Sequence, residues 1–178
     1  MDLPYFEGIT ANDLVALVDL MEPHQYAPDE VIVREGDEGP SPLYIATAGQ
    51  VEITKLAPDG TERRLAELDS PTIFGEIELF CQIPNVATTR ALSPVAAFSL
   101  SRPAFDAQFD AGHPAITRFT LNVARVACHR LAIADGMLAR MLGGEDLVQL
   151  RRLAFASMAK SDDDRLSRTT GFFKRPRR

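Results

Sequence analysis

Two short stretches hold the residues best suited to bind or react with a ligand: Phe74-Gly75-Glu76-Ile77-Glu78-Leu79 and Pro84-Asn85-Val86-Ala87-Thr88. In the first, two carboxylates stand at alternate positions, and a carboxylate pair is one arrangement that can serve as general acid and base. Their spacing makes an acid–base couple a poor interpretation. The chain has no Gly-x-Ser-x-Gly nucleophile elbow and no phosphate-binding P-loop. These features predict a protein that is not an enzyme.

Histidine and cysteine are too few and too scattered to suggest a metal centre. His24, His113 and His129 form no His-x-His pair, and two of them fall in the C-terminal part of the chain, where helices are expected. Cys81 and Cys128 lie far apart, with neither Cys-x-x-Cys nor metal-ligand spacing. We expect both cysteines to be reduced, buried, small hydrophobic residues. A redox role would require a lowered thiol pKa.

Composition and charge favour a folded, soluble protein with an acidic body. The chain is 46% hydrophobic and 25% charged, which suits one packed core under a charged surface. Residues 161–178 hold six basic and three acidic residues, so the formal net charge of −6 leaves −9 on residues 1–160. Such a body is repelled by the phosphate backbone of nucleic acids. With neither a bilayer-spanning apolar run nor a secretory signal at the start, the expected location is cytoplasmic.

The middle of the chain has the alternating pattern and closely spaced turns of an antiparallel β structure. Pro58-Asp59-Gly60 is expected to close a hairpin, because Asp-Gly readily adopts the positive φ of such turns. Short strands at this spacing favour a barrel or jelly roll over alternating βαβ units. The expected strands are 31–33, 43–45, 51–54, 65–68, 87–92 and 95–100.

Helices are expected on both sides of these strands. Thr10 and Asp13 begin a short amphipathic helix before Pro23, and Ser101 can cap a helix that has Pro103 in its first turn. A longer helix starts near Pro114 and stops at Gly143-Gly144, and a short one spans 147–158. The apolar stripe of the long helix, over residues 116–141, leaves two interpretations open: packing on the chain's own barrel, or a helix pair in a homodimer.

The span from about 24 to 141 resembles the cyclic-nucleotide-binding domain family, which includes protein kinase A regulatory subunits, gated channels and catabolite-activator-type regulators. The resemblance rests on an ordered series of motifs. They are Val31-Ile32-Val33-Arg34-Glu35-Gly36-Asp37, Leu43-Tyr44-Ile45, Gly49-Gln50-Val51, Phe74-Gly75-Glu76-Ile77-Glu78-Leu79, Pro84, Ala87-Thr88, Phe98-Ser99-Leu100 and Phe105. It implies a mainly β fold with flanking helices: an antiparallel jelly-roll β-barrel with a short N-terminal helix and C-terminal helices.

For the ligand site, the resemblance implies a phosphate-binding cassette that runs from Phe-Gly-Glu through a short helical turn to an Arg-Ala or Arg-Ser pair. Glu76 matches the glutamate that binds the ribose 2′-OH, and Gly75 permits a close backbone approach. Backbone N–H groups of the turn would meet the cyclic phosphate. If a ligand is retained, the site comprises Gly75, Glu76, Ile77, Glu78, Asn85, Val86, Ala87 and Thr88.

The chain departs from this pattern where the phosphate should bind. Asn85 takes the place of the arginine, Glu78 takes the place of a small residue, and Val86 replaces the small residue that follows the arginine. Asparagine is neutral and too short to replace a guanidinium fork. Arg90 could swing in, but it belongs to the following strand. We therefore expect weak or lost affinity for cAMP and cGMP, and no other cofactor.

The sequence thus predicts four segments: an N-terminal helical segment (1–22), a cyclic-nucleotide-binding-like barrel (23–112), C-terminal helices (113–160) and a basic flexible tail (161–178).

Only 34 residues follow Gly144, too few for a DNA-binding module, so direct DNA binding is not expected. The predicted function is regulatory, through protein–protein contacts; the alternative is a structural or adaptor subunit of a larger assembly, without a small-molecule ligand. The tail residues expected to contact an acidic protein surface or an anionic membrane are Phe172, Phe173, Lys174, Arg175, Arg177 and Arg178.

Overall fold

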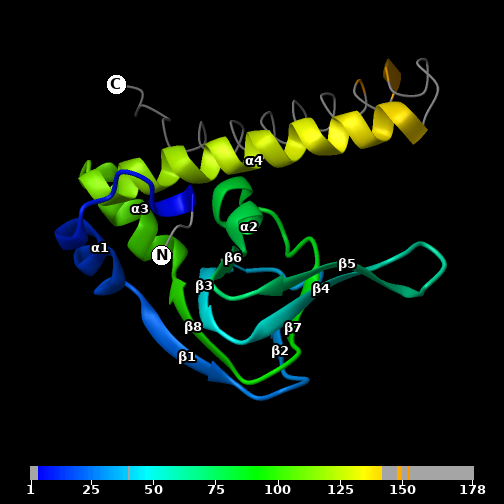
Figure 1. Cartoon of the computed structure of the whole chain (residues 1–178), viewed down its shortest axis with the longest axis horizontal. Coiled ribbons are helices and arrows are strands. Elements are labelled where there is room, and N and C mark those ends of the chain that lie inside the picture. Colours follow the sequence, from blue (N-terminus) through cyan, green and yellow to red (C-terminus); the bar gives the residue numbers. More distant parts are fainter. Residues whose placement is uncertain (1–3, 40, 142–147, 150–151, 153–178) are drawn as a thin grey trace, which may run out of the picture. The chain divides into compact units, whose positions relative to one another are not determined.

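The computed structural model describes residues 4–39, 41–141, 148, 149 and 152. Two units are distinguished, residues 1–126 and 127–178. The first unit holds two four-stranded antiparallel sheets (Figure 1). The first sheet has the order β1-β8-β3-β6, from β1 (Glu22–Tyr26), β8 (Val95–Leu100), β3 (Leu43–Ala48) and β6 (Thr72–Phe74). The second has the order β2-β7-β4-β5, from β2 (Val31–Val33), β7 (Thr88–Ala91), β4 (Gln50–Leu56) and β5 (Glu62–Asp69).

Strand β3 shows why the first sheet is covered on both faces. Successive side chains of a strand point to opposite faces, and all of the first four residues of β3 are buried. Leu43 and Ile45 join the cluster beneath the helices, whereas Tyr44 and Ala46 join the cluster that Val51 of the second sheet shares. The sheet therefore separates two apolar clusters.

Helices cover the first of these clusters. They are the 3₁₀ turn η1 (Pro4–Phe6), α1 (Ala11–Val18), α3 (Arg102–Asp110) and α4 (Pro114–Met141), together with the short α2 (Glu76–Cys81). Both predicted caps are present: the Thr10 and Ser101 hydroxyls accept the backbone N–H of Asp13 and Ala104, at 3.2 and 3.4 Å. Buried Asn122 of α4 donates to the carbonyls of Tyr5 and Glu7, which attaches η1 to α4.

The predicted mainly β fold with flanking helices is confirmed. In the described residues the strands form two separate sheets, and no continuous strand pairing closes them into the predicted barrel. The expected strands 31–33 and 95–100 match β2 and β8 in full. Strands β1 and β6 were not predicted individually. The prediction that Cys81 and Cys128 are buried is wrong, since both are exposed.

Helix α4 begins at Pro114, as expected, but only the start of its apolar stripe is buried. Ile116, Phe119 and Val123 are at most 2% exposed, so they pack within the first unit. In the second unit Leu131 and Met141 are 62% and 81% exposed. The predicted stop at Gly143-Gly144 and the basic tail lie outside the described residues, as does most of the helix expected at 147–158. No helix in the described ranges is long and apolar enough to span a membrane.

Candidate ligand-binding site

Helix α2 starts in a backbone conformation that requires glycine. Its N-cap, Gly75, has φ 80°, in the left-handed region that side chains disfavour. A Cβ atom on Gly75 would lie 2.6 Å from the carbonyl oxygen of Pro42, just before β3. The backbone of Gly75 therefore lies so close to the residue before β3 that a side chain would not fit there.

Asn85 is buried in the connection between α2 and β7 and is bonded to the loop between β2 and β3. Its side chain is surrounded by protein, with 6% of the residue exposed. The Ser41 hydroxyl donates to Oδ1, and Nδ2 donates to the carbonyl of Arg34 at 2.9 Å. Its backbone N–H donates to Asp37, and its carbonyl accepts from Gly36. This residue thus joins two loops of the fold.

Glu78 is on the buried side of α2 and is hydrogen-bonded to Val86, the residue after Asn85. Only 9% of Glu78 is exposed, and its Oε1 accepts the backbone N–H of Val86 at 2.9 Å. A carboxylate that accepts an N–H makes a charge-assisted hydrogen bond, stronger than a neutral one. The carboxylate that the sequence places in the cassette is therefore turned inward, onto the cassette's own backbone.

Two further polar groups of the segment 85–88, the Val86 carbonyl and the Thr88 hydroxyl, also have partners within the chain. The Lys55 ammonium donates to the carbonyl of Val86, and it pairs with Glu35 at 3.1 Å. The Thr88 hydroxyl accepts the backbone N–H of Glu35 at 3.0 Å. The backbone N–H of Leu56 and the Lys55 ammonium hold the pKa of the Glu35 carboxyl below its usual value. Residues 85–88 are thus held from several sides.

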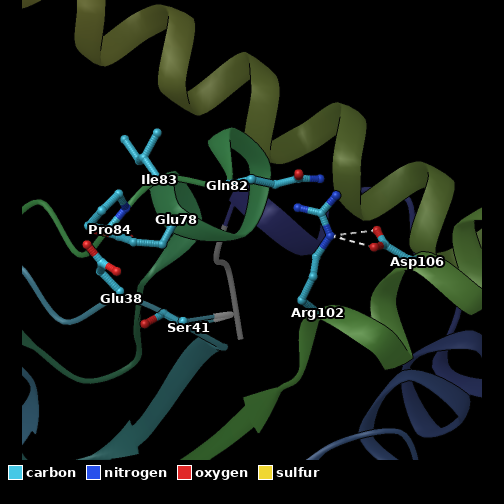
Figure 2. A pocket seen from close by; sticks show the side chains of 9 residues that line it. Glu38, Ser41, Glu78, Gln82, Ile83, Pro84, Arg102 and Asp106 are labelled. Carbon is cyan, nitrogen blue, oxygen red and sulfur yellow. Dashed lines mark hydrogen bonds and ion pairs between the residues drawn. The ribbon is translucent and has the colours of Figure 1, made fainter. Parts of the chain in front are cut away.

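A pocket of about 530 Å³ lies beside α2, a size suited to a small molecule. Three of its lining residues are carboxylates, Glu38, Glu78 and Asp106, and one is a cation, Arg102. Figure 2 shows Arg102 and Asp106 on one side and the two glutamates on the other. The complete lining is Glu38, Gly39, Ser41, Glu78, Gln82, Ile83, Pro84, Arg102 and Asp106.

The cation of this pocket is already paired. The Nε of Arg102 donates to both carboxylate oxygens of Asp106 at 2.7 Å (Figure 2). Nη1 of Arg102 donates to the carbonyl of Leu79. Arg102 therefore links the first turn of α3 to α2. With its charge offset by Asp106, the two glutamates leave the pocket lining net negative, which disfavours an anionic ligand.

The residues expected at the site are brought into one region, on α2 and on the segment that follows it. Gly75, Glu76, Ile77 and Glu78 lie at the start of α2, with Ile77 44% exposed. Val86, Ala87 and Thr88 are half-buried, and only Glu78 of the whole expected set lines the pocket. The expected tail residues, Phe172, Phe173, Lys174, Arg175, Arg177 and Arg178, lie outside the described residues.

Arg90, the alternative cation considered from the sequence, is bonded elsewhere. It lies on β7, donates to the carbonyl of Asp29 at 3.1 Å and approaches Glu52 at 3.6 Å. The cations near the site are instead Lys55 and Arg102, which sequence reasoning missed. The Arg102–Asp106 spacing indicates an ion pair on one helix turn, but only the tertiary structure places α3 beside α2.

Comparisons with known proteins agree with this geometry. The family model described as "Cyclic nucleotide-binding domain" matches residues 23–111. The CRP-like cAMP-activated global transcriptional regulator of Mycobacterium tuberculosis is 29% identical over 77% of this chain and 59% of its own length. A cAMP-dependent protein kinase regulatory subunit of Blastocladiella emersonii is 31% identical over 58% of this chain and 26% of its own length. The chain thus spans less than two thirds of either relative.

A solved structure shows the same fold. The catabolite activator protein of Thermus thermophilus superposes with a TM-score of 0.71 and 24% identity, over 78% of this chain and 63% of that one. Since the family model matches half of the chain, from the second residue of β1 through β8, this chain belongs to the cyclic nucleotide-binding domain family.

Proposed function

We propose that this chain is a non-enzymatic, cytoplasmic regulatory protein whose affinity for cyclic nucleotides is weak or lost and which acts through protein–protein contacts. Its relatives are named as regulators and regulatory subunits, which supports a regulatory role. The alternative of a structural or adaptor subunit shares the protein contacts but has no small-molecule ligand. The acidic body supports the absence of direct DNA binding.

The observation that carries the proposal is the burial of Asn85 with both ends of its amide bonded within the fold. Both ends of that amide are bonded to the β2–β3 loop, and the residue is 6% exposed, so the side chain is held in the fold and adds no positive charge that could meet a phosphate. Loss of one charge-assisted contact in a desolvated site costs on the order of 2–5 kcal/mol, which is about a 30-fold to several-thousand-fold loss of affinity. The Glu78 carboxylate adds like-charge repulsion.

Calorimetric titration with cAMP and cGMP tests the proposal. We expect dissociation constants weaker than about 10 μM, some −7 kcal/mol, because a neutral amide stands at the position where the family's arginine would meet the phosphate. Complete absence of binding favours the adaptor alternative over a weakly responsive regulator. Tighter binding of either nucleotide contradicts the proposal, because it requires an anion contact that neither Asn85 nor Glu78 supplies.

A homodimer through residues 116–141 remains part of the proposal, with a narrower contact surface. Ile116, Phe119 and Val123 are buried within the chain, so the exposed side chains of the apolar stripe lie beyond Val126, among them Leu131. Light scattering should give twice the mass of one 19.5 kDa chain. Leu131→Asp should reduce this mass to one chain, and Leu121→Asp, on the same helix outside this surface, should not. A single-chain mass for the unsubstituted protein at high micromolar concentration contradicts the dimer.

The basic tail is the second proposed contact region. Phe172, Phe173 and the four cations that follow combine apolar and cationic groups, a composition suited to an acidic protein surface or anionic membrane. The acidic body and the basic tail would then have separate roles in one chain.

A further inference from the structure

The pocket beside α2 has room for a small molecule, so charge and hydrogen bonding, and not space, decide whether an anion binds in it. Its volume of about 530 Å³ lies within the range of small-molecule sites. Glu78 lines this space and at the same time holds the Val86 N–H. The Glu78 side chain therefore lines the pocket and also occupies a backbone donor of Val86, two residues beyond Pro84 of the lining.

The Val86 N–H is the group at which an internal and an external anion would compete. The backbone carbonyl of Val86 is bonded to Lys55, and both backbone groups of Asn85 are bonded to the β2–β3 loop. Neutral carbonyl oxygens accept the backbone N–H of Asn85, whereas a carboxylate accepts that of Val86. A backbone N–H that already holds an anionic oxygen cannot donate to a second one at full strength.

We propose that the Glu78 carboxylate is an internal substitute for an anionic ligand and the specificity-determining residue of this pocket. Its carboxylate accepts the hydrogen bond of the Val86 N–H and places a negative charge in the pocket lining. Phosphate-bearing ligands are therefore excluded, although the pocket has space for them. The inference rests on the proposed function, which requires only that affinity is weak; here the cause is assigned to one side chain.

Inorganic phosphate is the simplest probe of this competition. In Glu78→Ala the Val86 amide should exchange its hydrogen roughly 10- to 100-fold faster, because its charge-assisted bond is gone. Millimolar inorganic phosphate should then produce a saturable shift of the Val86 amide resonance, which is absent in the unsubstituted protein. Glu38→Ala is the charge-matched comparison, since it removes a carboxylate from the same lining and leaves the Val86 bond in place.

A phosphate response of Val86 in Glu78→Ala alone supports the inference. Equal responses in Glu78→Ala and Glu38→Ala overturn it, because general charge would then explain the effect. No response in Glu78→Ala overturns it as well, and that result leaves the proposed weak nucleotide affinity of the unsubstituted protein intact.

Restoring a guanidinium provides the second arm, with cAMP as the probe. We expect Glu78→Ala combined with Asn85→Arg to bind cAMP at least roughly tenfold more tightly than Asn85→Arg alone, and Glu38→Ala combined with Asn85→Arg to gain much less. No gain from Glu78→Ala in this background contradicts the inference. If the Asn85→Arg proteins do not fold, the phosphate experiment decides alone, since it keeps Asn85.

Discussion

Replacing Asn85 with alanine should lower the free energy of unfolding by about 2–4 kcal/mol, because both hydrogen bonds of a buried amide are lost and the Arg34 carbonyl keeps only the long bond from the Asp37 N–H, at 3.3 Å. Asn85 is 6% exposed, so water does not readily replace the amide. The residue that stands where the family's arginine is expected would then serve the stability of the chain. Urea denaturation at neutral pH measures the effect.

Asn12→Ala is the matched control for this prediction. It makes the same chemical change at an exposed position in α1 and should alter stability by no more than about 0.5 kcal/mol. Ser41→Ala should cost less than Asn85→Ala, because only one of the two side-chain bonds is lost. An Asn85→Ala protein as stable as the unsubstituted one would show that the amide does not hold the two loops together.

The strands that sequence patterns located well are those with alternating or β-branched residues between clear turns. Val31–Val33 and Val95–Leu100 are of this kind. Strand β1 escaped prediction because its sequence, Glu-Pro-His-Gln-Tyr, has no apolar alternation, and it forms at the sheet edge by pairing with β8. The strand conformation of β1 therefore depends on pairing with a distant segment, which no local sequence pattern encodes.

The exposure of the two cysteines shows a second limit of prediction from the sequence. Residue type favours a buried cysteine, but the phase of the helix decides. Cys128 follows buried Phe119 by nine residues, which is half a turn out of phase at 3.6 residues per turn, so it lies on the opposite face of α4. Cys81 is the last residue of α2 and is likewise exposed.

For the site, the sequence indicated the substitutions but not their structural consequences. Asn85 and Glu78 stand out because the motif around them is ordered and their types do not fit an anion. That Asn85 joins two loops, and that Glu78 bonds Val86, depends on contacts across the fold. Arg102 was missed for the same reason, since its partner Leu79 is 23 residues away.

The largest loss of stability is expected for Phe119→Ala, about 3–5 kcal/mol. Phe119 is fully buried in α4, and its ring lies 5.8 Å from that of Phe6 in η1. The same cluster contains Leu43 and Leu100 of the first sheet, so truncation opens a cavity where helices and sheet meet. Surrounding side chains can close such a cavity only in part, because they are held in a dense core.

Leu121→Ala tests whether this cost comes from burial or from helix formation. Leu121 lies two residues away on the same helix but is 45% exposed, and both substitutions introduce the best helix former. Urea denaturation should show a loss below about 1 kcal/mol for Leu121→Ala against several for Phe119→Ala. Equal losses would mean that the first half of α4 does not pack on the sheet, and then Ile116, Phe119 and Val123 would again be available to a second chain.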